Sequence, residues 1–342
     1  MMTIWELLAE AKEAGASDLH LCAGMPPAIR LDGDILISDR PVLSAEQVMS
    51  FLETVMTDDQ RKTFEIEKEC DFSIDVGEGV RFRVNAFFQE RGAAAVFRAI
   101  LPEVRTLEDL SCPSVIKRVI SKHAGLVLVT GPTGSGKTTT LAGMIDFLNH
   151  QFPYHIITVE DPIEFIHVPH RCVINQREVR RHTHGFSNAL RSALREDPDC
   201  ILVGELRDLE TIRLALTAAE TGHLVLATLH TNSAVHTLDR IIDVFPAEEK
   251  YLVRAMLAES LSAVICQRLI RKIGGGRVAA WEVMVCTPAI RNLIREGKTA
   301  QMHSTIQTSQ SQGMVTLEAS VDDLVKKRVI SAEEATAVLG RA

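Results

Sequence analysis

Long apolar runs are missing from this chain of 342 residues. A helix that spans a bilayer needs about 20 consecutive apolar residues, and the apolar runs here, such as 125–130, have only the length of a strand. The first residues, 1–10, carry acids and no basic start, which is typical of an amphipathic helix rather than of a secretory signal peptide. We therefore expect the protein in the cytoplasm.

Cysteine pairs of the C-x-x-C type and an excess of basic charge are missing as well. The seven cysteines are scattered along the chain, so neither a zinc site nor a disulfide framework is expected. The formal net charge is −8 and the isoelectric point is about 5.9. Nucleic-acid binders more often carry a basic face, so DNA and RNA are not expected as partners.

The N-terminal third mixes helical and strand patterns. Residues 4–14 favour a helix, and two capping boxes, Ser44 with Gln47 and Thr57 with Gln60, predict the starts of two more. Three strand-like runs separated by short turns then predict an antiparallel meander over 72–76, 81–89 and 93–101.

The pattern changes after this part of the chain. Continuous apolar runs now alternate with helical stretches, at 126–130, 155–159, 200–203 and 224–228. Such runs indicate a mainly parallel sheet that is buried on both faces. We therefore expect an N-terminal domain over 1–103, a linker over 104–114 and an α/β domain of the doubly wound type over 115–342.

A phosphate-binding loop follows the first of these runs. Residues 131–138 read Gly-Pro-Thr-Gly-Ser-Gly-Lys-Thr and open a helix, as the motif requires. Its glycines let the backbone approach phosphate oxygens, the lysine supplies a cation, and the Thr138 hydroxyl is suited to Mg²⁺. The predicted nucleotide-binding residues are Thr133, Gly134, Ser135, Gly136, Lys137, Thr138 and Thr139.

Carboxylates stand at the ends of two later strands. Glu205 follows the apolar run 200–203, and ligands of open α/β sheets bind at such strand ends. A carboxylate there can orient and deprotonate an attacking water. Glu160 and Glu164 follow another strand and are candidates for the metal and water shell, although acids beside a proline also occur in ordinary turns.

Histidines and arginines add further candidates. His223 and His230 flank one strand; His230 is expected just beyond its end, near the phosphates, although a lone histidine is more often structural. Arg81 and Arg83 alternate along one strand and share a face, and Arg98 lies on the next. These arginines either form a solvated basic face or reach the nucleotide of a neighbouring subunit, as arginine fingers do.

Several segments together resemble the type IV pilus retraction ATPases of the PilT kind, within the secretion and pilus ATPase superfamily. Besides the phosphate-binding loop, the resemblance rests on segments spread over nearly the whole chain: 16–21, 81–87, 160–164 (Asp box), 193–199, 203–208 (Walker B), 214–223, 228–231 (His box) and 289–296.

The resemblance implies a PAS-like N-terminal domain before a RecA-like P-loop NTPase domain with a C-terminal helical region. It implies a homo-hexameric motor that hydrolyses Mg-ATP between subunits and powers pilus retraction and twitching motility. Glu205 would be the catalytic base and Glu160 would assist at the metal and water. His223 and His230 would sense nucleotide, and Arg81, Arg83 and Arg98 would supply cations near the phosphates.

The resemblance also implies an inner-membrane platform protein as partner, with the motor peripheral at the pilus base. Retraction is favoured over assembly because the chain lacks the long N-terminal extension and the four-cysteine zinc loop of assembly members. Small departures around the His box leave open a retraction-like paralogue that serves another pilus or secretion system. A paralogous ATPase that shares the task, a non-hydrolysing scaffold in a mixed ring and a DNA translocase are further alternatives.

Overall fold

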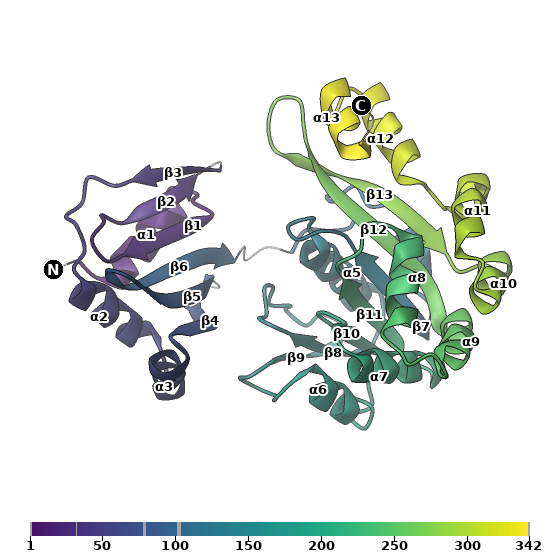
Figure 1. Cartoon of the computed structure of the whole chain (residues 1–342), viewed down its shortest axis with the longest axis horizontal. Helices are drawn as coiled ribbons and strands as arrows, with labels where there is room; N and C mark the ends of the chain where they lie inside the picture. Colours follow the sequence, from purple (N-terminus) through teal and green to yellow (C-terminus); the bar gives the residue numbers. More distant parts are fainter. Residues whose placement is uncertain (1, 32, 78–79, 101–103, 341–342) are drawn as a thin grey trace. The chain divides into compact units, whose positions relative to one another are not determined.

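The computed structural model describes residues 2–31, 33–77, 80–100 and 104–340 of the chain. These residues form two compact units (Figure 1). The first comprises Met1–Glu103 together with Glu164–Ile166, and the second comprises Val104–Ile163 and His167–Ala342. The segment 104–114, expected as a linker, belongs to the second unit, where its Leu107 is buried in the core.

The first unit is built on an antiparallel sheet of six strands in the order β3-β2-β1-β6-β5-β4. Its strands are β1 (Asp18–Cys22), β2 (Ala28–Leu31), β3 (Asp34–Ile37), β4 (Glu69–Asp75), β5 (Arg81–Gln89) and β6 (Gly92–Ile100). The predicted meander is confirmed as β4, β5 and β6, while Leu101, expected in its last strand, lies outside the described residues.

Three helices pack on one face of this sheet: α1 (Ile4–Glu13), α2 (Ala45–Val55) and α3 (Asp58–Glu67). Both predicted capping boxes are present, at the starts of α2 and α3. Apolar side chains of the helices, such as Leu8 and Phe64, share one core with Phe97 of β6. Because side chains alternate along a strand, the other face of the sheet carries the polar residues that stand between these core residues in the strands.

The second unit contains a sheet of seven strands in the order β13-β12-β7-β11-β10-β8-β9. Its strands are β7 (Gly125–Thr130), β8 (His155–Glu160), β9 (Val173–Glu178), β10 (Cys200–Val203), β11 (Leu224–Leu229), β12 (Leu261–Arg271) and β13 (Arg277–Val285). All neighbours are parallel except the edge pair β12–β13. The four predicted strands are confirmed, and β9, β12 and β13 are additions to them.

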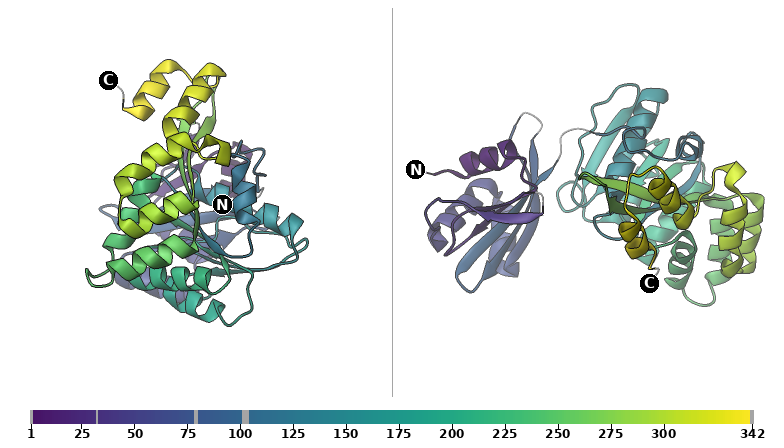
Figure 2. Two further views of the ribbon diagram at one scale, coloured as in Figure 1. Left: turned by 90° about the vertical axis from the view of Figure 1, so that its right-hand side faces the viewer. Right: turned by 90° about the horizontal axis from the view of Figure 1, so that it is seen from above.

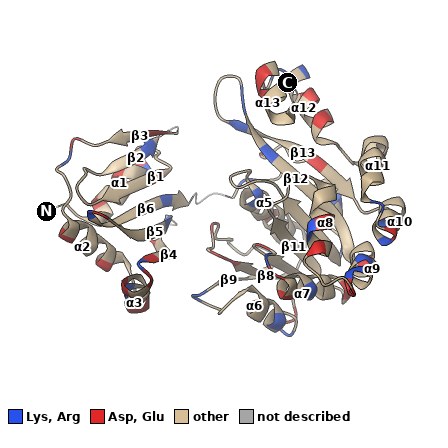
Figure 3. Cartoon of the chain, viewed as in Figure 1, with Lys and Arg blue, Asp and Glu red and all other residues tan. Residues whose placement is uncertain are grey.

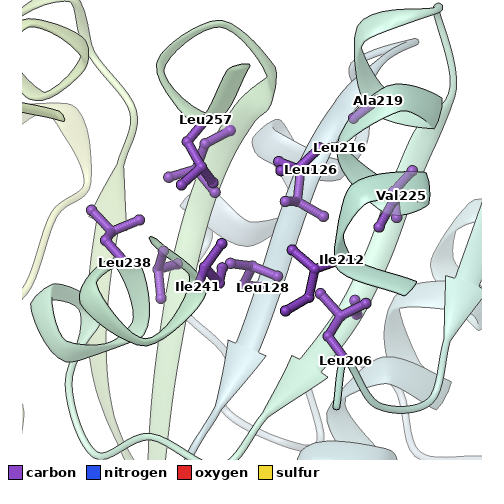
Figure 4. Packing of buried hydrophobic residues seen from close by; sticks show 14 of the residues in the cluster. Leu126, Leu128, Leu206, Ile212, Leu216, Ala219, Val225, Leu238, Ile241 and Leu257 are labelled. Atoms are coloured by element: carbon purple, nitrogen blue, oxygen red, sulfur yellow. The ribbon is translucent and has the colours of Figure 1, made fainter. Parts of the chain in front are cut away.

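Helices cover both faces of this sheet, which confirms the predicted doubly wound α/β class. On one face lie α4 (Val115–Ile120) and α5 (Lys137–Gln151); on the other lie α6 (Phe186–Ala193), α7 (Leu209–Glu220), α8 (Ala234–Asp243) and α9 (Lys250–Ser260). Figure 4 shows Leu126 and Leu128 of β7 on the second of these faces, together with Ile212 and Ile241. Val127 and Val129 alternate with them and pack on the face of α5.

Helices dominate the C-terminal part of the second unit, where they gather along one side of it (Figure 2). They are α10 (Pro288–Glu296), η1 (Thr299–Gln301), α11 (Met302–Thr308), η2 (Gln310–Gln312), α12 (Leu317–Lys326) and α13 (Ala332–Leu339). The last two form a small core of their own with β12 and β13, in which Val321 packs with Ile270 and Ala280.

Charged residues of both signs are interspersed over the helices and loops of each unit (Figure 3). Within the described ranges, the helices are all too short or too polar to span a bilayer.

Candidate functional site

The phosphate-binding loop connects the end of β7 to the start of α5 in the second unit. Gly136, which precedes the first helical residue, has φ +88° and offers no side-chain cap to the helix. The first-turn N–H groups of a helix have no acceptor within the helix itself, so those of Thr138 and Thr139 are directed out of its positive end. This arrangement is suited to binding an anion.

Two glycines of the loop lie close to β12. A Cβ at Gly131 would lie 2.3 Å from the carbonyl oxygen of Gln267, and one at Gly136 would lie 2.9 Å from its Nε2 atom. The Gln267 side chain also accepts a hydrogen bond of 2.7 Å from the Thr140 hydroxyl, in the first turn of α5. Gln267 was not predicted as a site residue, because its partners are more than a hundred positions away in the chain.

Gly134, by contrast, faces open space: a Cβ there would have no atom within 4 Å among the described residues. Its φ of +77° is the left-handed conformation that glycine tolerates best. The loop is therefore braced by β12 on one side and open on the other. The open side is the one on which phosphate oxygens can approach the backbone.

Lys137 is the buried cation of the loop. Its ammonium group donates to the carbonyl oxygens of Gly131, at 2.9 Å, and Pro132, at 3.1 Å. It also lies 3.4 Å from Nδ1 of His230, which follows the end of β11. β11 and β7 are neighbouring parallel strands, so the residues after their carboxyl ends meet at the same edge of the sheet.

His230 links this lysine to Glu205. Its Nε2 atom lies 3.3 Å from Oε1 of Glu205, while Nδ1 faces Lys137. A lysine ammonium is a donor only, so the lone pair of Nδ1 is the group suited to face Lys137, and an Nε2–H is the group suited to face the carboxylate. The imidazole of His230 thus lies between a cation and an anion.

The backbone around Glu205 is held by both neighbouring strands. Gly204 donates to the carbonyl oxygen of Val159 in β8, at 2.8 Å, and accepts from the hydroxyl of Thr228 in β11, at 2.5 Å. Leu206 in turn donates to the carbonyl oxygen of Thr228, at 3.0 Å. Glu205 therefore lies just beyond the end of β10, in backbone that is hydrogen-bonded to both neighbouring strands.

The charges near Glu205 keep its carboxyl group ionised. Partial burial raises the pKa of Glu205, but the hydrogen bond and positive charge of Arg207, with the contribution of His230, outweigh it and bring the pKa below its ordinary value. Arg207 lies 2.8 Å from Oε2 of Glu205. Arg207 was not predicted; its place two residues after the strand-end glutamate is the sequence signal that could have identified it.

Glu160 lies at the end of the neighbouring strand β8, and it is buried. The hydroxyl of Thr158 donates to its Oε1 atom at 2.6 Å, and the Gln176 amide lies 3.4 Å from the same oxygen. A Cβ at Gly204 would lie 3.4 Å from the Cα atom of Glu160. The two predicted strand-end carboxylates, Glu160 and Glu205, thus project from adjacent strand ends.

One predicted residue is placed elsewhere, and another lies in an irregular segment. His223 precedes β11 at the amino end of the strand, where its carbonyl oxygen accepts from Gly125 at the start of β7. It therefore lies at the opposite edge of the sheet from the phosphate-binding loop of its own chain, whereas His230 lies beside that loop. Glu164 follows β8 in an irregular segment four residues after Glu160.

The three candidate arginines share one face of the sheet in the first unit. Arg83 and Arg98 are direct cross-strand partners, and Arg81 lies two residues before Arg83 on β5. Arg83 binds both carboxylate oxygens of Asp71, at 3.2 and 2.5 Å. Arg98 donates to Asp18 at 2.9 Å, and Arg81 donates to the Ser73 hydroxyl at 3.0 Å.

The residues present fit a nucleoside polyphosphate. The open backbone around Gly134, the uncapped start of α5 and the ammonium group of Lys137 all face one edge of the sheet. The ionised Glu205 lies on the same edge and is linked to Lys137 through His230. Phosphate binding beside a strand-end carboxylate is the arrangement that hydrolysis of a phosphoanhydride requires.

Comparison with known proteins agrees with this arrangement. The family model described as type II/IV secretion system protein matches residues 2–275. The type IV pilus retraction ATPase PilT of Pseudomonas aeruginosa is 63% identical over 98% of this chain and 97% of its own length. A twitching motility protein of Neisseria gonorrhoeae is 54% identical over 90% of this chain and 83% of its own.

A solved structure is similar as well. A crystal structure of the pilus retraction motor PilT with bound ADP superposes with a TM-score of 0.92 at 46% identity, and the match covers 99% of this chain and 97% of the other. The similarity therefore extends over both units and includes a relative that binds nucleotide. The chain is a P-loop ATPase that belongs to the PilT family of the type II/IV secretion system proteins.

Proposed function

We propose that this protein is the motor that powers type IV pilus retraction, and with it twitching motility, by hydrolysing Mg-ATP. The observation that carries the proposal is the contact of Lys137, His230 and Glu205 beside the phosphate-binding loop. The relatives named above support it, because one is described as a retraction ATPase and another as a twitching motility protein, and both match nearly all of this chain.

Different residues of the second unit have different roles in the proposed hydrolysis of ATP. Thr133, Gly134, Ser135 and Gly136, with the first turn of α5 through Thr139, bind the phosphates through backbone N–H groups. Lys137 neutralises charge on the β and γ phosphates. Glu205 accepts a proton from the attacking water. His230 senses whether the γ phosphate is present, because its Nδ1 atom competes with phosphate oxygens for Lys137.

A magnesium ion bound with ATP would neutralise further charge on the phosphates. The Thr138 hydroxyl, at the start of α5, is the residue suited to hold it. Glu160 and Glu164 complete the proposed metal and water shell. The buried position of Glu160, whose Cα atom lies close to Gly204, supports its part in this shell, since the ends of β8 and β10 lie side by side there.

The assembly we propose is a homo-hexamer with nucleotide sites between subunits. Arg81, Arg83 and Arg98 would then act on the nucleotide of a neighbouring subunit, and His223 would take part in sensing from across such a boundary. The motor would work in the cytoplasm against an inner-membrane platform protein at the pilus base. Two alternatives remain within the family. A paralogous ATPase shares the task, or the motor serves another pilus or secretion system.

The test is a count of surface pili on cells that lack this protein, with the parent gene or a Glu205→Gln copy restored. More pili and lost surface motility, reversed by the parent gene but not by the variant, are expected for a retraction motor that needs hydrolysis. Bald cells would contradict retraction and indicate assembly. Unchanged pili would assign the ATPase to another secretion system, and full rescue by the variant would indicate a non-hydrolysing scaffold.

A further inference from the structure

A buried carboxylate outside the nucleotide site is bonded to the helix that follows His230. Glu282 lies on β13, and only 7% of its surface is exposed. Its Oε1 atom accepts a hydrogen bond of 2.6 Å from the backbone N–H of Ala234. Ala234 is the first residue of α8 and lies four positions after His230.

The connection between β11 and α8 is short and internally bonded. It consists of the four residues 230–233, because β11 ends at Leu229 and α8 begins at Ala234. The hydroxyl of Thr237 lies 2.7 Å from that of Thr231 and donates to the carbonyl oxygen of Ser233, also at 2.7 Å. His230 therefore lies between the end of β11 and the start of α8, and a shift of the helix start is passed to it through only three residues.

Glu282 connects that helix start to the strand pair beside the phosphate-binding loop. Glu282 is the cross-strand partner of Cys266 on β12, and Cys266 is adjacent to Gln267. Gln267 packs against the phosphate-binding loop, as described above. The strand pair β12–β13 thus contacts the loop through one residue and the start of α8 through another.

The contact between Glu282 and Ala234 is suited to holding the start of α8 in place. A carboxylate near a helix N-terminus interacts favourably with the helix dipole and with an N–H group that has no intrahelical acceptor. Burial raises the pKa of Glu282, with a contribution from Glu318, while the Ala234 N–H, His303 and Arg268 oppose that effect. Loss of the carboxylate would leave a buried N–H without its acceptor.

We propose that Glu282 is a positioning residue of the ATPase: it fixes the start of α8 and so holds the His230 imidazole between Lys137 and Glu205. The inference rests on the proposed role of His230. It predicts that Glu282 affects turnover more than nucleotide affinity, because the phosphate-binding loop itself keeps its bonds.

The first experiment compares three variants of the full chain. Glu282→Leu removes the acceptor at similar volume, and Glu282→Gln keeps an amide oxygen that can accept from Ala234. Glu333→Gln changes an exposed carboxylate on α13 as a control. Steady-state hydrolysis gives kcat and KM, and titration with a fluorescent ADP analogue gives affinity. Misplacing a catalytic group by about 1 Å costs on the order of a hundredfold in rate.

We expect Glu282→Leu to lower kcat by up to about that hundredfold and to leave ADP affinity within about threefold, since no phosphate contact is removed. Glu282→Gln and Glu333→Gln should stay within about threefold of the parent in both quantities. If Glu282→Leu does not fold, Glu282→Asp replaces it, because the shorter side chain keeps the charge but cannot reach Ala234. An unchanged kcat in the folded variant would overturn the inference.

A double-mutant cycle separates positioning from a general structural role. In a His230→Asn background, adding Glu282→Leu should lower kcat by less than about a further twofold, because the imidazole that Glu282 positions is already gone. An equal loss in both backgrounds would mean that Glu282 acts only on the fold, and would overturn the proposal. If His230→Asn alone has the kcat of the parent, the proposed role of His230 is wrong, and so is this inference. The assignment of the chain as an ATPase would not be affected by that result.

Discussion

The imidazole of His230 lies 3.4 Å from the ammonium group of Lys137, although the two residues are 93 positions apart in the chain. Its other nitrogen faces Glu205. The proposed phosphate-binding lysine, the proposed sensor and the proposed base are therefore joined by two contacts. Any nucleotide phosphate that draws Lys137 toward itself must alter the environment of His230, and through it that of Glu205.

Replacing Lys137 by alanine should abolish most nucleotide affinity. Its charge-assisted hydrogen bonds to phosphate are each worth about 1.5–3 kcal/mol, which corresponds to roughly a 10- to 100-fold weaker Kd. Fluorescent ADP titration measures this change. The matched control is Lys122→Ala, an exposed lysine before β7. Equal affinities for the two variants would show that the loop does not bind phosphate through Lys137.

Replacing Glu205 by glutamine should stop turnover and leave binding intact. Loss of a general base lowers the rate by about 10²- to 10⁴-fold, whereas the loop that binds the phosphates is unchanged. Phosphate release and ADP titration measure the two effects on the same sample. Glu210→Gln, an exposed carboxylate on α7, serves as the control. Turnover within about threefold of the parent would assign the base to another residue.

Removing Arg207 should move the acidic limb of the pH–rate profile. The Arg207 charge is one of the causes that hold the pKa of Glu205 below its ordinary value, against the effect of burial. Without that cation the pKa of Glu205 rises, so the base becomes protonated at a higher pH than in the parent. We therefore expect the acidic limb of kcat in Arg207→Ala to shift toward neutral pH. A limb that stays in place, or moves to lower pH, would contradict this assignment.

Alanine substitutions in the loop should separate backbone strain from crowding. Gly134→Ala meets no neighbour but must adopt a positive φ, at a cost of about 1–2 kcal/mol. Gly136→Ala has the same strain and also meets Gln267 Nε2 at 2.9 Å. Without nucleotide, thermal unfolding should show a larger decrease in the midpoint for Gly136→Ala than for Gly134→Ala.

The double variant Gly136→Ala with Gln267→Ala completes this experiment. Since the second substitution removes the atom in conflict but also the Thr140 hydrogen bond, each effect must be compared with Gln267→Ala alone. A smaller decrease from Gly136→Ala in the Gln267→Ala background is expected. Equal decreases in the two backgrounds would show that β12 does not constrain the loop.

Mixed subunits test whether the arginines act across a subunit boundary. One variant carries Glu205→Gln with intact arginines, and the other replaces Arg81, Arg83 and Arg98 by alanine with Glu205 intact. An arginine finger contributes about 10³- to 10⁵-fold to the rate, so each variant alone should be inactive. Mixing them should restore hydrolysis if one subunit completes the site of the next. Differently tagged subunits show whether the two variants assemble together. If they do and the mixture stays inactive, the arginines do not act on the nucleotide of a neighbouring subunit.

Local patterns in the sequence were sufficient to predict the phosphate-binding loop, two helix starts and four strands of the second unit. The phosphate-binding loop is contiguous, because its backbone must turn between one strand and one helix within a few residues. The helix starts at Ser44 and Thr57 were predicted because a capping box joins residues only three positions apart. The strand runs around Leu126 and Val225 were recognised because burial on both faces demands continuous apolar residues.

Strands whose ends or side chains carry no local signal were not predicted from the sequence. β12 begins at Leu261 directly after α9, with no turn residue to separate strand from helix. β9 carries polar residues such as Asn175 and Gln176, which do not resemble a buried strand. In both cases the strand exists because a neighbouring strand offers backbone hydrogen bonds, and this partner is not encoded in the local pattern.

The sequence by itself determined that this chain binds nucleotide phosphates, since the residue types and their spacing are those that the chemistry needs. Only the tertiary structure decided which distant side chains complete the site. It placed His230 at the loop and His223 at the far edge, and it brought Gln267 into contact with the first turn of α5 and Glu282 into contact with the start of α8. The physical reason is the order of the strands: β7 lies between β11 and β12, and that neighbourhood is settled by packing over the whole sheet.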